Sequence, residues 1–404
     1  DLWVEAAQCH FLTGQIEKAE EMLRLVLSKC ESRLHKLVVY RTMVEMYTIQ
    51  VAYDKVIETV EESLKLFKIR LPQNALSTQF RVLIDLLNVK FQLRKNQPED
   101  ILDFPISTSS EHIELSNILV KAAPSAYISN QDLFAWMVLF QVRYAIKLGT
   151  TPYSSLAYMG YGMILQKAFG DLDAAFAFSN MALQLNEKMG RTMPVHSLKF
   201  TFFHFVKHFR DDASSTAIEF KQLYSPAVEA GDHIYTGFLL NNLIWNGAVV
   251  GQDLKEMCKE GLKYLKILEQ QKNTNSYDLL LSRLQSLLAL NGQPMVPWSV
   301  NGREISMEEK RDQFRSEHSY AQLVFSFISS FQLSYLLDEV KVDLEQILEA
   351  DKYMSYVEDI YSYADYALTM VMIASKFYKE KGIFKRQLIR IIKKHNKLMA
   401  KKAK

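Results

Sequence analysis

Few residues in this sequence have the types and spacing to perform chemistry, and a histidine pair is the first candidate. His204 and His208 lie four residues apart, which places them on one face of a predicted helix over residues 195–210. A carboxylate from a neighbouring helix would complete a metal site. No third ligand is indicated, and Lys207 lies between the two histidines. We therefore interpret the pair as the partly exposed side of an aromatic-rich helix, with a metal site as the alternative, and expect no cofactor.

The motifs of common enzyme classes are missing. The sequence contains neither G-x-x-x-x-G-K-[ST] nor G-x-G-x-x-G, the loops that cradle phosphates. It also lacks H-E-x-x-H, C-x-x-C and G-x-S-x-G, and no serine stands out as an activated nucleophile. We expect this chain to have no catalytic residue and not to be an enzyme.

Three asparagines are candidates for contact with a partner. Asn241, Asn242 and Asn246 lie inside a predicted helix, although asparagine is a modest helix former. On the helices of a repeat groove, asparagine can hold the backbone or terminal carboxylate of a bound peptide. The alternative is that these side chains hydrogen-bond a neighbouring loop between helices.

Tyrosines gather around the predicted loop at residues 149–152. Tyr144, Tyr158 and Tyr161 are the candidates for ligand or partner contact, with Tyr127 and Tyr153 nearby in the sequence. Aromatic residues at helical spacing usually belong to a core, with the hydroxyl finding a partner at its edge. Both a core role and a binding role are kept as hypotheses.

The composition favours a helical chain able to bury a large core. The 404 residues are 49% hydrophobic and 23% charged, with only 14 Gly and 9 Pro to make turns. A net charge of +2 gives no electrostatic footprint for nucleic acid. The three cysteines have no metal-ligand or redox spacing, so we predict small buried residues in a reducing, cytoplasmic compartment.

A repeat of helix pairs explains how these residues would be positioned. Trp3 and Ala19 occupy tetratricopeptide-like positions on either side of a break at Thr13-Gly14. A second unit follows about 37 residues later, near the tetratricopeptide period of roughly 34 residues. Residues 156–190 repeat the pattern most clearly, with a turn at Gly170-Asp171. The fold class predicted is all-α, a tetratricopeptide-like α-solenoid of stacked antiparallel helix pairs without a strand pair.

Turn residues divide the predicted repeats. Asn291 to Gly302 is the strongest break. We therefore predict helical repeats at 1–290, a loop or linker at 291–306, and further helical repeats at 307–404. This last part is predicted to form single helices over 308–337, 344–372 and 382–402, the last of them basic and amphipathic. Lysines and arginines near a helix C-terminus are ordinary, so a solvated face is the first interpretation of that helix, with an acidic partner or membrane surface as the alternative. Both chain ends look like boundaries inside a longer polypeptide.

Residues 321–337 carry no charge, and the length of this uncharged stretch approaches that of a membrane-spanning helix. However, Gln322 and several serines follow helical spacing and form one polar stripe, which is typical of a helix packed between neighbours. We predict a buried helix and no membrane span.

Several segments resemble one family of signalling proteins. They are L-K-L-F at 64–67 with L-P at 71–72, P-S-A-Y-I-S-N-Q at 124–131 and F-G-D at 169–171. The chain resembles the tetratricopeptide-like middle region of large bacterial and fungal multidomain sensor kinases, over residues 1–289 and more weakly to 373. In that family a kinase-like domain and an AAA-type ATPase come first, and a GAF domain and a histidine kinase or other output domain follow.

The resemblance implies that the parent protein is an ATP-dependent kinase, but no ATP-binding or phosphotransfer motif is present here to carry over. The function predicted is a regulatory scaffold in signal transduction, which contacts flanking domains or a protein partner and couples sensing to an output domain. The alternatives are a stand-alone peptide-binding adaptor and a small-molecule sensor domain.

Overall fold

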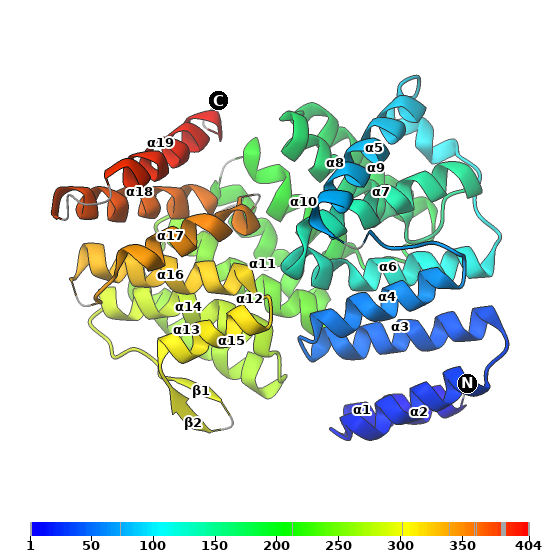
Figure 1. Ribbon diagram of the computed structural model, residues 1–404, viewed down its shortest axis with the longest axis horizontal. Coiled ribbons are helices and arrows are strands. Elements are labelled where there is room, and N and C mark those ends of the chain that lie inside the picture. Colours follow the sequence, from blue (N-terminus) through cyan, green and yellow to red (C-terminus); the bar gives the residue numbers. More distant parts are fainter. Residues whose placement is uncertain are drawn as a thin grey trace. The chain divides into compact units, whose positions relative to one another are not determined.

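The structure is a computed structural model that describes residues 2–72, 74–211, 213–300, 302–338, 340–358, 360, 362–380 and 385–402. These residues form helices almost throughout, with one short strand pair (Figure 1). The chain divides into two compact units, residues 1–198 and 199–404, and helix α10 (Val195–Phe205) contains the boundary. Among the described residues, no helix is long and apolar enough to cross a membrane.

The first unit consists of helices that pack mainly against their neighbours in sequence. Pairs form between α1 and α2, α3 and α4, α6 and α7, and α8 and α9, while α3 also packs against α6 and α5 against α7. The helices are α1 (Leu2–Leu12), α2 (Ile16–Lys29), α3 (Arg33–Ile49), α4 (Tyr53–Lys65), α5 (Ala75–Leu93), the 3₁₀ helix η1 (Pro98–Asp103), α6 (Ser110–Ser129), α7 (Gln131–Leu148), α8 (Ser154–Phe169) and α9 (Leu172–Lys188).

The predicted turns explain where the clearest pairs form. Gly14 has a positive φ of 83° between α1 and α2, as the predicted break requires. Gly170 ends α8 in the left-handed conformation, and the Asp171 side chain then accepts a hydrogen bond from the Ala174 backbone N–H to begin α9. A core of apolar side chains, including buried Leu37, Tyr47 and Trp136, joins α1–α4, α6 and α7.

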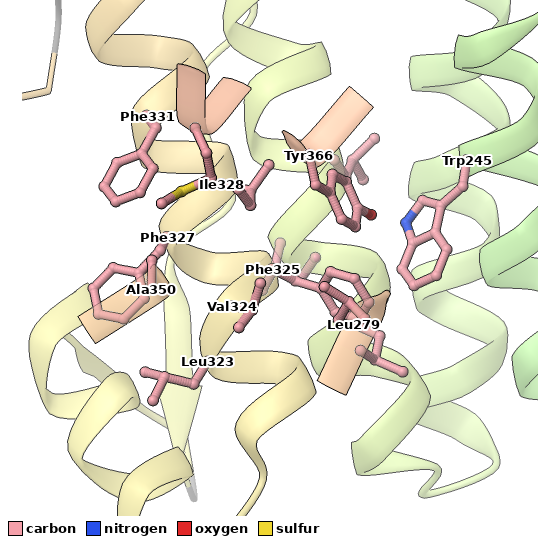
Figure 2. Close-up of a cluster of buried hydrophobic side chains, with 14 of the residues drawn as sticks. Trp245, Leu279, Leu323, Val324, Phe325, Phe327, Ile328, Phe331, Ala350 and Tyr366 are labelled. Carbon is pink, nitrogen blue, oxygen red and sulfur yellow. The ribbon is translucent and has the colours of Figure 1, made fainter. Parts of the chain in front are cut away.

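The second unit also consists of packed helices. Its elements are α11 (Ala213–Glu229), α12 (His233–Val249), α13 (Leu254–Gln270), α14 (Thr274–Leu290), β1 (Trp298–Val300), β2 (Arg303–Ile305), α15 (Met307–Ser316), α16 (Tyr320–Leu336), α17 (Leu344–Tyr353), the 3₁₀ helix η3 (Met354–Val357), α18 (Tyr363–Glu380) and α19 (Lys385–Lys402). Helix α16 lies against α14, α15, α17 and α18. Figure 2 shows the apolar cluster around it, with Phe327 and Phe331 on α16 and Trp245 on α12. The polar side chains along α16 that were predicted to form a stripe, Gln322 among them, are buried. The prediction that residues 321–337 form a helix packed between neighbours is therefore confirmed.

The all-α prediction with packed helix pairs is confirmed, but several details were wrong, and Cys9 and Cys30 are not buried as predicted. The predicted strand-free stretch contains the antiparallel pair β1–β2, in which Ser299 lies opposite Glu304. The single helix predicted from 308 to 337 is two helices, because His318 takes a positive φ of 54° between α15 and α16. The helix predicted over 344–372 is likewise divided by η3. The domain division at 291–306 stays a prediction, and that stretch lies within the second unit.

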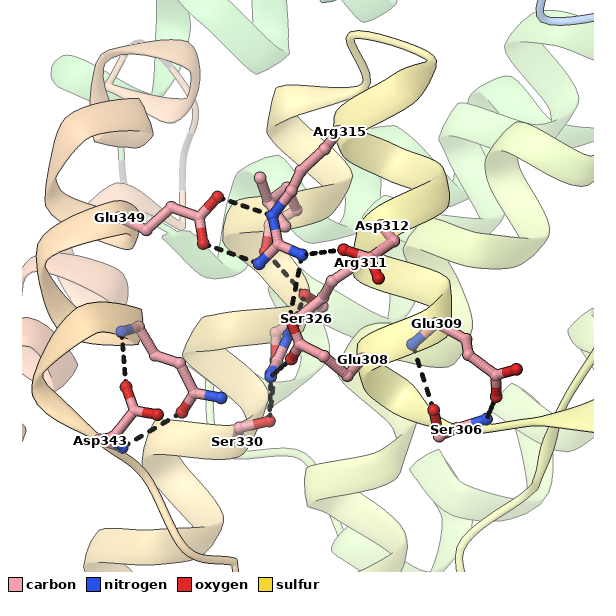
Figure 3. Close-up of polar contacts among 12 residues, drawn as sticks. Ser306, Glu308, Glu309, Arg311, Asp312, Arg315, Ser326, Ser330, Asp343 and Glu349 are labelled. Atoms are coloured by element: carbon pink, nitrogen blue, oxygen red, sulfur yellow. Dashed lines mark hydrogen bonds and ion pairs between the residues drawn. The ribbon is translucent and has the colours of Figure 1, made fainter.

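Basic side chains of α15 join this helix to α16 and α17 inside the second unit (Figure 3). Arg311 Nη2 donates to Ser330 Oγ of α16 at 2.7 Å, and its Nε donates to Ser326 Oγ at 3.1 Å. Arg315 forms a bidentate pair with Glu349 of α17, with both N–O distances 2.8 Å. Charge-assisted bidentate pairs fix geometry as well as adding stability, so α15 is held in one orientation.

The last helix, α19, is attached to α17 by one carboxylate. Asp351 Oδ1 accepts from Lys394 Nζ at 2.9 Å and from the buried His395 Nε2 at 2.8 Å. Burial raises the pKa of the Asp351 carboxyl, but the hydrogen bonds from His395 and Lys394 lower it by more than burial raises it. The pKa of Asp351 therefore lies below its ordinary value. The stabilisation is therefore present above the ordinary carboxyl pKa of about 3.9 and is lost as the pH falls through the lowered pKa.

Replacing Asp351 with asparagine is expected to loosen α19. The variant loses hydrogen bonds to a charged acceptor, which contribute about 1.5–3 kcal/mol. Hydrogen–deuterium exchange at pH 7 should show faster exchange of the α19 amides. The matched control is Asp338→Asn, which removes the pair of Asp338 with Lys376 where the aspartate is almost fully exposed. Equal protection of α19 in both variants would contradict the role of Asp351.

Candidate protein-interaction surface

The two histidines considered for a metal do not share one helix face. Helix α10 ends at Phe205, and Val206 has φ −129° before the 3₁₀ turn η2 (Lys207–Phe209) that contains His208. The prediction of a continuous helix to residue 210 was therefore wrong. His204 is buried, and its Nδ1 lies 2.9 Å from Asn242 Oδ1. Burial lowers the pKa of His204 to about 4, while the hydrogen bond to Asn242 raises it. In the described part of the chain, no group of three His, Cys, Asp or Glu side chains is arranged to hold a metal.

The three asparagines lie on α12 and are buried. Asn241 Nδ2 donates to the carbonyls of Gly237 and Ser276, at 3.0 and 2.9 Å. Asn242 Nδ2 donates to the Phe238 carbonyl, while its Oδ1 faces His204. The Asn246 amide has no hydrogen-bond partner within the described residues. These contacts join α12 to α10 and α14 inside the second unit, and the partner-contact role of the asparagines stays a prediction.

The candidate tyrosines belong to two adjacent helices. Tyr144, on α7, lies with its ring centroid 4.2 Å from that of Phe140. Tyr158 and Tyr161, on α8, are buried, and Tyr161 packs edge-on against Phe178 of α9. Burial raises the pKa of all three hydroxyls, that of Tyr161 to about 12. Their surroundings are those of core aromatics, and a binding role is untested.

Helix α5, unlike the buried asparagines and tyrosines, presents an exposed surface that a protein partner could contact. Its first turn is fixed by a capping box, in which the Asn74 side chain accepts from the Ser77 N–H and Ser77 Oγ from the Asn74 N–H. One face then packs against α7 through buried Leu86, Val89 and Leu93. On the same face, the buried Asp85 carboxylate pairs with Arg143 of α7. These contacts hold α5 in a defined orientation on the first unit.

The other face of α5 is apolar and exposed. Its large side chains recur every three or four residues, and their exposed fractions range from 40% for Ile84 to 81% for Leu76. At 3.6 residues per turn these positions fall on one side of the helix, away from the face on α7. We call this set the α5 stripe: Leu76, Phe80, Leu83, Ile84, Leu87 and Phe91.

The charges that border the α5 stripe are positive. Arg81, Lys90, Arg94 and Lys95 are exposed on or just beyond α5, and Asp85, the helix's acidic residue, is buried on the opposite face. Lys90 Nζ lies 4.2 Å from the ring centroid of Phe169, and the Arg94 guanidinium lies 3.5 Å from that of Phe91. The surface therefore combines exposed leucine and phenylalanine with cations.

Such a surface has the chemistry of a protein-contact site. Contiguous exposed apolar side chains on a soluble domain mark contact sites for other proteins, and an apolar row at three- and four-residue spacing matches the face of a second amphipathic helix. The α5 stripe was not predicted from the sequence. The missed signal was a helix with apolar residues on two opposite sides, at 76, 80, 83, 87 and 91 as well as at 86, 89 and 93.

Comparison with known proteins points to signal transduction. No protein-family model matches the chain. Over 324 aligned residues the chain is 23% identical to a protein of Dictyostelium discoideum described as hybrid signal transduction histidine kinase G. The alignment covers 74% of this chain but only 9% of that protein. The chain is therefore similar to a small region of a signal-transduction histidine kinase.

Proposed function

We propose that this chain is a regulatory, protein-binding region of a multidomain signalling protein of the hybrid sensor-kinase type. It would act as a tetratricopeptide-like scaffold that couples a nucleotide-dependent module, such as an AAA-type ATPase, to an output domain in the cytoplasm. The similarity to a region of a histidine kinase supports the signalling context. The observation that carries the binding role is the exposed α5 stripe.

The occupant proposed for the α5 stripe is an amphipathic helix from another domain of the same signalling protein. Its apolar face would cover the leucines and phenylalanines, and burying one such side chain contributes about 1.5–3 kcal/mol. Acidic residues at the edges of that helix would pair with Arg81 and Lys95, which lie beside the stripe. A helix that binds in only one functional state would shift the equilibrium between active and inactive forms.

The test uses the purified chain and the other domains of the full-length protein, expressed separately. We expect saturable binding by fluorescence anisotropy, weakened at least tenfold in the double variant Leu83→Asp/Leu87→Asp. If two leucines are no longer buried on binding, the affinity should fall by more than tenfold. Both side chains are exposed in the free chain, so circular dichroism should show an unchanged fold.

The matched control places aspartate at two exposed apolar positions elsewhere, Ile218→Asp/Leu368→Asp. This control should keep the affinity within about twofold. Loss of binding in both double variants would show a non-specific effect of added charge. No binding to any domain of the same protein would reject the proposal in favour of a free-standing adaptor or a small-molecule sensor.

A further inference from the structure

Helix α19 carries a row of exposed cations on one face. Arg386, Arg390, Lys393 and Lys397 are exposed and follow one another at steps of four, three and four residues. Within the described residues, none of the four has an ion-pair or hydrogen-bond partner. We call these four side chains the α19 row. With a rise of 1.5 Å per residue, the row is about 16 Å long and one side chain wide.

The row is separate from the contacts that attach α19. Leu388, Ile391 and His395 are buried on the opposite side of the helix, which packs against α18. Lys394, between the two faces, pairs with Asp351 of α17. The four cations of the row therefore take no part in holding the helix, and they are free to meet a partner.

Nothing within α19 compensates this charge. Like charges three and four residues apart repel one another on a helix, and residues 385–402 contain no Asp or Glu. A helix dipole favours cations in the last turn only, whereas Arg386 lies in the first turn, where a cation is unfavourable. This charge distribution differs from the mixed charges typical of a solvated helix face.

Helix α13 shows the contrast within the same unit. Its exposed lysines also recur at three- and four-residue spacing, but glutamates alternate with them: Lys255, Glu256, Lys259, Glu260, Lys263, Lys266 and Glu269. Lys259 Nζ lies 3.6 Å from a Glu256 carboxylate oxygen. Alternating charges of this kind are typical of a solvated helix.

We propose that the α19 row binds an acidic helix of a protein partner whose carboxylates recur at the same steps of four, three and four residues. Two helices lying side by side would bring each carboxylate to one cation of the row. Charge-assisted pairs of this kind give specificity and speed association more than they add affinity. The proposal concerns the second unit and does not depend on the α5 stripe in the first.

Other anionic partners fit the row less well. A membrane-surface helix inserts its apolar face into the lipid. No large apolar side chain of the described part of α19 is exposed, because these side chains are buried or partly buried. Single-stranded nucleic acid is bound by cations together with aromatic side chains on which the bases stack. Residues 385–402 contain no Phe, Tyr or Trp.

The test uses the full chain and two synthetic helical peptides of identical composition. The matched peptide carries four glutamates at steps of four, three and four, and the scrambled peptide distributes them around the helix. We expect the matched peptide to bind at least tenfold more tightly at 50 mM salt, with an affinity that falls as salt is added. Two other anionic probes are tested separately. One is a vesicle that contains phosphatidylserine, and the other is a uridine oligonucleotide.

The variant Arg386→Glu/Arg390→Glu should weaken binding of the matched peptide at least tenfold. Glutamate near the start of a helix is favourable, so this variant should remain folded. The control Lys263→Glu/Lys266→Glu makes the same change of charge on α13 and should keep the affinity within twofold. Equal binding of both peptides, no peptide binding, or tighter binding of vesicles or oligonucleotide would each overturn the proposal.

Discussion

Replacing Lys310 with methionine is expected to lower the free energy of unfolding of the second unit by about 3–5 kcal/mol at pH 7. Lys310 Nζ lies 2.8 Å from Asp278 Oδ2, and both side chains are buried, with exposed fractions of 3% and 9%. Burial raises the pKa of Asp278 to about 6, while Lys310 lowers it. Without the lysine, a buried carboxylate has no opposing charge, and it must bind a proton for the unit to fold.

The sign of the pH dependence follows from the raised pKa. Asp278 in the unfolded chain has a pKa near 3.9, so folding of the Lys310→Met variant takes up a proton between that value and its higher folded pKa. The loss of stability should therefore grow as the pH rises from 5 to 7. Urea unfolding at the two pH values measures it, with the fluorescence of Trp298, which lies beside Lys310, as a local probe.

Two further variants separate the pair from its parts. The double variant Asp278→Leu/Lys310→Met replaces the buried pair with apolar side chains, and we expect it to recover most of the lost stability. The control Arg303→Met breaks the pair of Arg303 with Glu309, which is exposed, and should change the unfolding midpoint little. A double variant less stable than the single one would show that the pair itself stabilises the unit.

Local sequence signals predicted most helix ends, because turn residues and apolar periodicity act over a few positions. The Gly170-Asp171 turn is an example, since glycine permits the positive φ that ends α8. The break between α15 and α16 was missed because His318 adopts a positive φ without any glycine or proline to mark it. Similarly, Val206 ends α10 with no breaker residue. Helix ends of this kind depend on packing against segments distant in sequence, and apolar periodicity carries no information about that packing.

The binding surfaces were harder to predict for a related reason. Apolar periodicity shows that a helix has an apolar face, but not whether another element covers it. The stripe of Leu83 and Leu87 and the face of Leu86 and Val89 both follow the helical period, yet only the second lies on α7. Conversely, Asn241 was considered for an exposed groove because asparagine is uncommon inside helices. Its side chain is buried instead, and one of its two partners, the Ser276 carbonyl, lies 35 residues away in sequence.

Replacing Gly149 with alanine is expected to destabilise the first unit by about 3 kcal/mol or more, because backbone strain and overpacking each cost about 1–3 kcal/mol. Gly149 ends α7 with φ 98° and ψ 155°, a backbone region open essentially to glycine alone. A Cβ atom there would lie 2.8 Å from Ser107 N and 2.9 Å from Pro105 O. Both are backbone atoms that cannot turn aside, so strain and overlap add. Urea unfolding followed by the fluorescence of the buried Trp136 measures the loss.

Gly170→Ala is the matched control, because Gly170 also has a positive φ, 70°, but no atom within 4 Å of the added Cβ. Conformational strain alone should cost about 1–2 kcal/mol there. The larger loss at Gly149 would come from the neighbouring segment, where the Ser107 N–H donates to the Thr150 carbonyl and the Thr150 N–H to the Pro105 carbonyl, at 2.8 and 2.7 Å. Hydrogen–deuterium exchange should therefore accelerate at these two amides in Gly149→Ala and not in Gly170→Ala. Equal losses in both variants would mean that φ alone, and not the close approach of residues 105–107, requires glycine at the end of α7.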